Sequence, residues 1–125
     1  VNDLLVFNGK MYAAGNMSLD GNNSTAMNYV NQLSQAGSNW SKAGSNNLPS
    51  YCTCLAIHKG QLVACGSAGN QGYIYKFNST DNVWETCLNS GVSLKSMLKI
   101  ESFNNSLYGL EKDLSTGQTS FIRLD

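Results

Sequence analysis

The sequence predicts an all-β chain built from tandem copies of one four-stranded unit. Two recurring motifs predict this architecture: a hairpin motif occurs three times in the 125 residues, and a strand, turn and tryptophan motif occurs twice. A third observation disfavours helices, because the only sustained apolar pattern is alternation and glycine and asparagine are spread throughout the chain. We therefore expect short antiparallel strands from one end of the chain to the other.

The first recurring element is a hairpin of two apolar strands joined by a two-residue turn. Residues 4–15 align with residues 55–66 at a shift of 51 positions, and a third copy begins at Ile100, 45 positions later. The turns of the three copies are Asn8-Gly9, Lys59-Gly60 and Asn104-Asn105. Glycine or asparagine at the second turn position fits a tight hairpin turn, which needs positive φ angles there.

The second recurring element is an apolar strand followed by a polar turn and a tryptophan. Residues 29–33 match residues 73–77 at a shift of 44 positions, and Trp40 matches Trp84 at the same shift. Residues 121–125 resemble a third copy of that strand, without the tryptophan that would follow. Because both tryptophans keep their place in the repeat, we expect them to pack between units rather than to stack on a ligand.

Four short strands in about 45 to 50 residues is the period of a β-propeller blade. We expect a single partial β-propeller over residues 1–125, with about 2.7 blades in an incomplete ring. The predicted blades span about 4–43, 51–88 and 96–125, and the third lacks its outer strand. A closed propeller needs at least four blades, so further blades are expected from the same longer chain, which we favour, or from other copies.

The unit resembles the kelch-type repeat, the superfamily that includes the central domain of galactose oxidase. The resemblance rests on the apolar strand before each turn, on Gly15 and Gly66 at the end of the second strand, and on an apolar residue seven positions before each tryptophan. The kelch double glycine corresponds here to Ala14-Gly15 and Cys65-Gly66. The resemblance implies a non-catalytic propeller that binds or scaffolds a partner, because only a minority of kelch-like propellers are enzymes.

Composition excludes some classes of partner. Charged residues make up 13% of the chain, the formal net charge is zero and no Lys/Arg cluster is present. The chain therefore lacks the phosphate-neutralising charge that provides most of the affinity for nucleic acids. The longest apolar runs are far shorter than the roughly 20 residues that cross a bilayer. Low charge and abundant Asn, Ser and Thr favour an exported protein, secreted or periplasmic, without fixing the compartment.

Candidate catalytic and metal-binding residues are few. His58 is the only histidine, and its equivalents are Phe7 and Phe103, so we expect it to pack beside the hairpin turn. The four cysteines all lie in the second unit: Cys52, Cys54, Cys65 and Cys87. Alternation along a strand places the first two on one face, with a spacing unlike that of zinc sites. The last two align with alanines. We favour buried thiols, with a disulfide or a metal site as alternatives, and predict no catalytic residue, metal or cofactor.

The connection between the second and third strands differs most from unit to unit. It spans residues 16–27, 67–72 and 111–119 in the three copies, and in propellers such loops gather on one face. We therefore expect a ligand there, most readily a protein. A glycan is the first alternative, and a non-catalytic part of a galactose-oxidase-like enzyme is the second. The candidate ligand-binding residues are Asn16, Asp20, Asn22, Asn23, Asn70, Gln71, Lys112 and Asp113.

Overall fold

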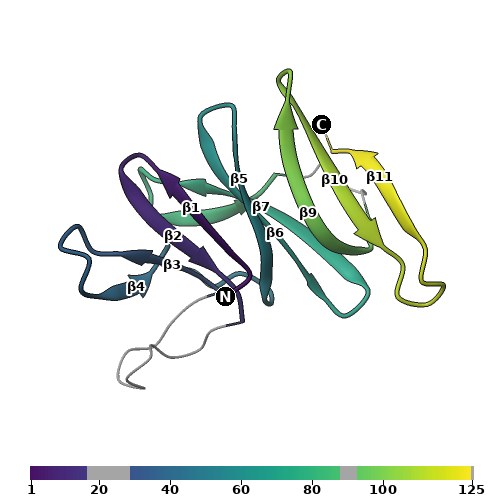
Figure 1. The fold of residues 1–125 in the computed structure, drawn as a ribbon, viewed down its shortest axis with the longest axis horizontal. Helices are drawn as coiled ribbons and strands as arrows, with labels where there is room; N and C mark the ends of the chain where they lie inside the picture. Colours follow the sequence, from purple (N-terminus) through teal and green to yellow (C-terminus); the bar gives the residue numbers. More distant parts are fainter. Residues whose placement is uncertain (17–28, 88–92, 125) are drawn as a thin grey trace.

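The computed structural model is all-β over the residues that it describes, which are 1–16, 29–87 and 93–124 (Figure 1). Within these ranges, eleven strands form three antiparallel sheets and there is no helix. It follows that the described residues include no helix long and apolar enough to cross a membrane. The all-β prediction is confirmed.

Each sheet is a meander in which consecutive strands are neighbours. The first sheet has the order β1-β2-β3-β4, with bounds Asp3–Phe7, Lys10–Ala14, Val30–Leu33 and Trp40–Lys42. The second has the order β5-β6-β7-β8, with bounds Cys52–His58, Gln61–Ala68, Gln71–Asn78 and Val83–Thr86. The third has the order β11-β10-β9, with bounds Ser96–Phe103 for β9, Ser106–Lys112 for β10 and Thr119–Arg123 for β11.

The first hairpin of every sheet turns through two residues with positive φ. The φ angles are 50° and 73° at Asn8-Gly9, 49° and 75° at Lys59-Gly60, and 49° and 62° at Asn104-Asn105. Two consecutive positive φ values identify the turn type whose twist matches that of the flanking strands. The turns predicted from the recurring Gly and Asn residues are therefore confirmed.

The three sheets succeed one another across the molecule, and their first strands are neighbours (Figure 1). Strand β5 contacts β1 on one side and β9 on the other. Polar contacts join these strands as well. The amide of Leu55 donates to Asp3 Oδ2 at 2.8 Å, and His58 Nδ1 lies 2.7 Å from Ser102 Oγ. His58 is half-buried and links the second sheet to the third, which agrees with a packing role.

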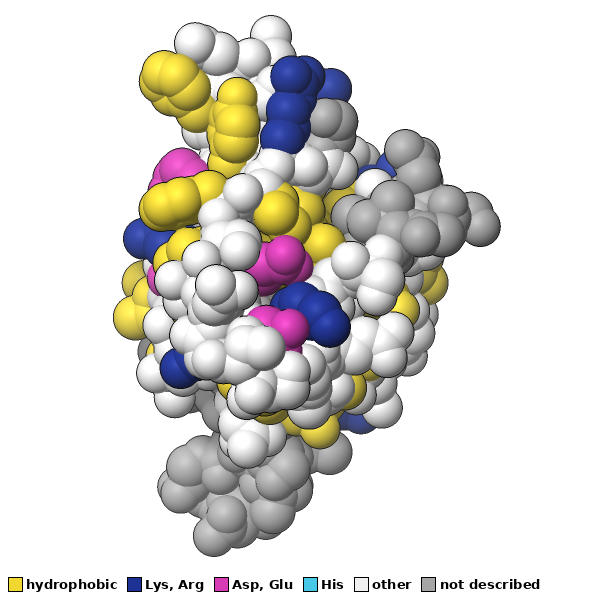
Figure 2. Space-filling model, turned by 90° about the vertical axis from the view of Figure 1, so that its right-hand side faces the viewer, with side chains coloured by type: hydrophobic (Ala, Val, Ile, Leu, Met, Phe, Trp, Pro, Cys, Tyr) yellow, Lys and Arg dark blue, Asp and Glu magenta, His cyan; other side chains and the backbone are white. Residues whose placement is uncertain are grey.

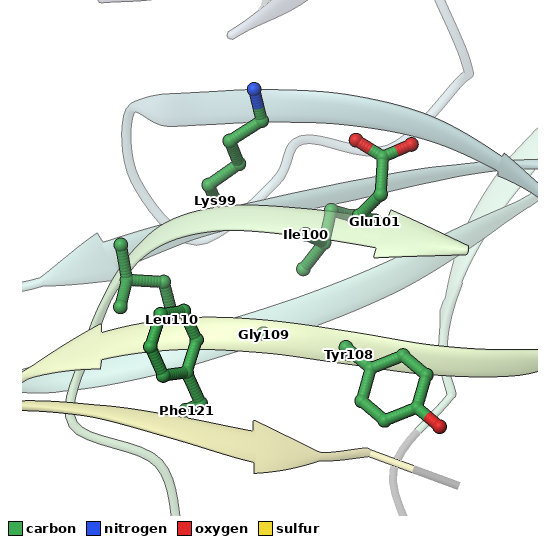
Figure 3. Close-up of a pocket in the computed structure, with 7 residues that line it drawn as sticks. All are labelled: Lys99, Ile100, Glu101, Tyr108, Gly109, Leu110 and Phe121. Atoms are coloured by element: carbon green, nitrogen blue, oxygen red, sulfur yellow. The ribbon is translucent and has the colours of Figure 1, made fainter. Parts of the chain in front are cut away.

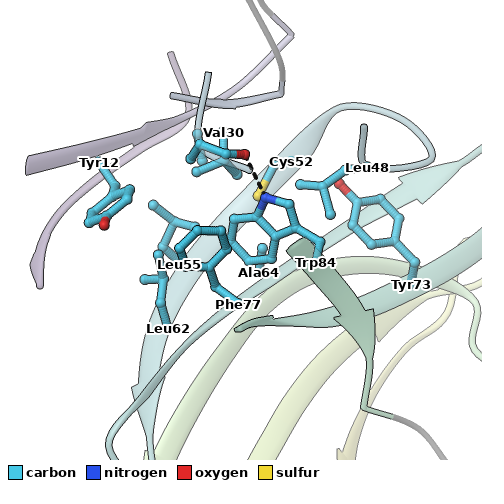
Figure 4. Close-up of a cluster of buried hydrophobic side chains, with 12 residues drawn as sticks. Tyr12, Val30, Leu48, Cys52, Leu55, Leu62, Ala64, Tyr73, Phe77 and Trp84 are labelled. Carbon is cyan, nitrogen blue, oxygen red and sulfur yellow. Dashed lines mark hydrogen bonds between the residues drawn. The ribbon is translucent and has the colours of Figure 1, made fainter. Parts of the chain in front are cut away.

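The first apolar core lies between the first and second sheets (Figure 4). It joins side chains of β2 and β3 to side chains of all four strands of the second sheet. Its larger members are Tyr12, Val30, Leu55, Leu62, Tyr73, Phe77 and Trp84. Their burial provides most of the free energy that holds the two sheets together.

Trp84 is the centre of this first core. Its ring is 3% exposed, and its centroid lies 4.9 Å from that of Phe77. The indole Nε1 donates to the carbonyl of Ala43 at 2.8 Å, shown as the dashed line in Figure 4. A Cβ at Gly44, where φ is 92°, would lie 2.8 Å from the same ring. The tryptophan therefore packs against the segment that leaves the first sheet, as its place in the repeat predicts.

The second apolar core lies between the second and third sheets. The second sheet contributes small and β-branched side chains, and the third contributes Met97, Ile100 and Leu107. The members from the second sheet are Cys54, Ala56, Val63, Cys65 and Ile74. Among the described residues, the second sheet is thus covered on both faces, whereas the first and third sheets are each covered on one.

Cys52 and Cys54 do not share a face, so that expectation was wrong. The β5–β6 register shifts between these two residues, where a β-bulge inserts an extra residue into β5. A bulge reverses the alternation of side chains beyond it. Cys52 therefore joins the first core and Cys54 the second.

Candidate functional site

The loops that join the second and third strands of the second and third sheets meet at one end of these sheets. The turn between β6 and β7 carries Asn70, and the loop between β10 and β11 begins at Asp113. Asn70 Nδ2 donates to Asp113 Oδ1 at 3.1 Å, and the amide of Leu114 donates to Asn70 Oδ1 at 2.8 Å. The Asn70 side chain therefore ties the two loops together through both of its polar atoms. We call Asn70, Lys95, Glu111, Asp113 and Ser115 the loop cluster.

The Asp113 carboxylate is held by several donors of the loop cluster. Its Oδ1 accepts from the amide of Ser115 at 2.9 Å and from the Ser115 hydroxyl at 2.6 Å. Lys95 Nζ lies 3.8 Å from Oδ2. The hydrogen bonds from Ser115, then that from Asn70 and the charge of Lys95, lower the pKa of Asp113 to about 2. A carboxylate with so low a pKa is a weak base, so Asp113 shapes the loop and does not suit proton transfer.

The segment that leads into β9 joins the same cluster. The amide of Lys95 donates to Glu111 Oε2 at 3.0 Å, and the amide of Gly72 donates to the carbonyl of Leu94 at 3.0 Å. A Cβ at Gly72 would collide with the carbonyl of Lys95, so glycine is required for this close approach. Three separate loops are thereby fixed relative to one another.

The eight residues predicted to bind a ligand are only partly brought together. Asn70 and Asp113 are in direct contact. Gln71 is exposed at the start of β7, and Lys112 is half-buried at the end of β10, on either side of that contact. Asn16 is exposed just after β2, in the first sheet. Asp20, Asn22 and Asn23 lie outside the described residues.

Sequence reasoning missed Lys95, Glu111 and Ser115. Glu111 and Ser115 lie within residues 111–119, a segment recognised as variable, so their position was a signal, whereas Lys95 lies outside the three variable segments. Ser115 stands two residues after Asp113. At this spacing an Asp carboxylate can accept hydrogen bonds from the amide and the hydroxyl of the later residue and so form a turn. Which of these residues touch one another depends on how the sheets pack.

A hollow of about 190 Å³ lies on the uncovered face of the third sheet (Figure 3). Leu110 and Phe121 stand next to each other on β10 and β11, with Tyr108 further along β10. Lys99 and Glu101 project from β9 along the other side. The hollow is shallow and mainly apolar.

A second hollow, of about 380 Å³, follows the first strands of the three sheets. Its lining includes backbone and side chains of β1, β5 and β9, with Asp3, Lys99 and Glu101 as its charged groups. Asp3 already accepts hydrogen bonds from the amides of Leu4 and Leu55. This hollow therefore has charged walls but no convergent set of unused donors and acceptors.

The cysteines are free thiols, and three of them are buried. Burial raises the pKa of Cys52 to about 12. Cys54 and Cys65 face each other across β5 and β6, and a hydrogen bond between their thiols lowers the pKa of Cys54 and raises that of Cys65. In the part of the chain that the structure describes, no group of His, Cys, Asp and Glu residues could hold a metal ion.

Comparison with known proteins does not assign the chain to a family. No protein-family model matches the sequence, and no curated protein matches it. Function must therefore be argued from the fold and from the loop cluster.

Proposed function

We propose that the chain is part of a kelch-like β-propeller and that it recognises a protein through the loops between its second and third strands. Consecutive four-stranded meanders that pack face to face, with their first strands side by side, support the propeller arrangement. The contact between Asn70 and Asp113 carries the functional part of the proposal.

The loop cluster favours protein recognition over catalysis. Its side chains are engaged with backbone groups and with one another, which fixes the loops without presenting a reactive group. Exposed neutral and charged groups on rigid loops suit the polar rim and hydrogen bonds of a protein interface. Gln71 and Lys112, on either side of the cluster, are the residues that we expect to contact the partner.

The proposal is tested by affinity capture with matched variants, followed by titration of each captured protein against purified chain. Lys112→Glu and Gln71→Ala change the loop surface, whereas Lys59→Glu makes the same charge change at the opposite end of the second sheet. We expect a partner whose affinity falls at least about tenfold with the loop variants and is unchanged by Lys59→Glu. Capture that does not depend on Gln71 or Lys112 would reject the loop surface.

A further inference from the structure

In the part of the chain that the structure describes, the first and third sheets each have one uncovered face, whereas both faces of the second sheet are covered. Leu4 and Met11 of the first sheet correspond to Leu55 and Leu62 of the second. Leu55 and Leu62 are buried against the first sheet, whereas Leu4 is 55% exposed and Met11 is exposed. Trp40 likewise remains half-buried where its counterpart Trp84 is buried. The first sheet therefore presents an apolar face that its equivalent buries against a preceding sheet.

The third sheet presents the complementary face. By strand register, Tyr108, Leu110 and Phe121 occupy the positions that Val63, Cys65 and Ile74 occupy in the second sheet. The match of residues 121–125 with 73–77 in the sequence is therefore out of register by one residue. Those three side chains of the second sheet are buried against the third, whereas Tyr108 is 40% and Phe121 is 88% exposed. Figure 2, which views the molecule from the β11 side, shows exposed hydrophobic side chains there among Lys, Arg, Asp and Glu. The chain thus exposes the two kinds of face that pack together between its first and second sheets and again between its second and third sheets.

Hydrogen bonding at the first strands is compatible with a contact between these two open faces. At the seam between the first two sheets, Asp3 Oδ2 accepts from the amide of Leu55. The third sheet has Lys99 at the position of Asp3 and cannot provide that acceptor. The amide of Leu4 corresponds to that of Leu55. It does not need an acceptor from a neighbouring sheet, because it already donates to Asp3 Oδ1 at 2.9 Å. The first sheet can therefore follow the third without leaving this donor unsatisfied.

We propose that a second copy of this chain covers the third sheet, with its own first sheet packed head to tail on Tyr108, Leu110 and Phe121. The contact is heterologous, and in a two-copy ring it forms twice, the second time between the third sheet of the second copy and the first sheet of the original one. Two copies would bring six sheets to one ring. This number lies within the range of about four to eight blades that propellers use. The inference rests on the packing of the sheets and not on the role of the loops.

The solution mass of the full 125-residue chain is measured by light scattering during size-exclusion chromatography over a range of concentrations. We expect twice the 13.5 kDa of one copy. Leu4→Lys and Phe121→Lys each place a charge on one of the two faces and should raise the dissociation constant at least about tenfold. Leu114→Lys makes the same change at an exposed leucine outside both faces, and its mass should equal that of the unmodified chain.

Mixing the two variants identifies the geometry. The Leu4→Lys copy keeps an intact third sheet and the Phe121→Lys copy keeps an intact first sheet, so an equimolar mixture should regain a dimer through one unmodified interface. A dimer that survives either substitution alone would be face-to-face and would overturn the proposal. A folded monomer at all concentrations, judged by the β signal in circular dichroism, would also overturn it. Loop-dependent capture by that monomer would leave the proposed function standing.

Discussion

The indole nitrogen of Trp84 donates to the carbonyl of Ala43 at 2.8 Å and so connects the outer strand of the second sheet to the chain leaving the first. The ring also contacts Phe77 and lies over Gly44. The Trp84 side chain is therefore buried among apolar groups, and the single hydrogen-bond donor of its indole is satisfied. The equivalent Trp40 pairs with Leu33 in the same register, but its ring stays half-buried.

This difference predicts unequal costs for the same substitution at the two tryptophans. Trp84→Ala should lower the free energy of unfolding by about 3–5 kcal/mol, because it leaves a cavity and removes the hydrogen bond to the carbonyl of Ala43. Trp40→Ala, in the Phe121→Lys background that removes association, should cost less than half as much. Urea unfolding monitored by circular dichroism measures both values. Equal losses would show that Trp84 does not hold the two sheets together.

A second prediction concerns the hairpin turn at Gly60, where φ is 75° and no atom lies within 4 Å of a Cβ placed there. Only backbone conformation limits the residue at this position. Gly60→Asn should cost less than about 1 kcal/mol, because asparagine tolerates this conformation and Asn105 adopts it at the same place in the third sheet. Gly60→Val should cost about 1–2 kcal/mol, because a β-branched residue is strained there. Thermal unfolding of both variants provides the test, and a valine variant as stable as the asparagine variant would contradict it.

The sequence predicted these hairpins because their information is local. A Gly or Asn at the second turn position and alternating apolar residues on both sides are enough to place each turn. The bulge between Cys52 and Cys54 was missed, because a single inserted residue leaves no local marker in the sequence of the strand. The variable loops were recognised by comparing the copies. The contact between Asn70 and Asp113 joins residues 43 positions apart. It depends on how the second and third sheets pack, which the local sequence pattern does not encode.

Asp113 provides a prediction about pH. Because hydrogen bonds and Lys95 lower its pKa to about 2 from 3.8, its contribution to stability should be complete above pH 3.8 and lost as the pH falls through about 2. Ser115→Ala should raise the pKa more than Asn70→Ala, because it removes the hydroxyl hydrogen bond that lowers the pKa of Asp113 most, while the amide of residue 115 still donates to the carboxylate. Nuclear magnetic resonance titration of the Asp113 side-chain carbonyl measures each pKa. If Asn70→Ala has the larger effect, the contact between the loops governs the carboxylate and our ordering is wrong.

The buried thiol of Cys52 predicts the opposite response at alkaline pH. Its pKa is raised from 9.0 to about 12 by burial, so the folded chain keeps a proton that the unfolded chain releases. Stability from this group is therefore complete below pH 9 and declines as the pH rises from 9 towards 12, by up to about 1.4 kcal/mol per pH unit. Cys52→Ala should reduce the slope of the free energy of unfolding against pH in urea titrations between pH 8.5 and 10.5. Labelling with a thiol reagent provides a second measurement: the half-buried Cys87 should react in the folded chain, whereas Cys52 should react only at the rate of unfolding. An unchanged slope together with rapid labelling of Cys52 would show that this thiol is accessible to solvent in the folded chain.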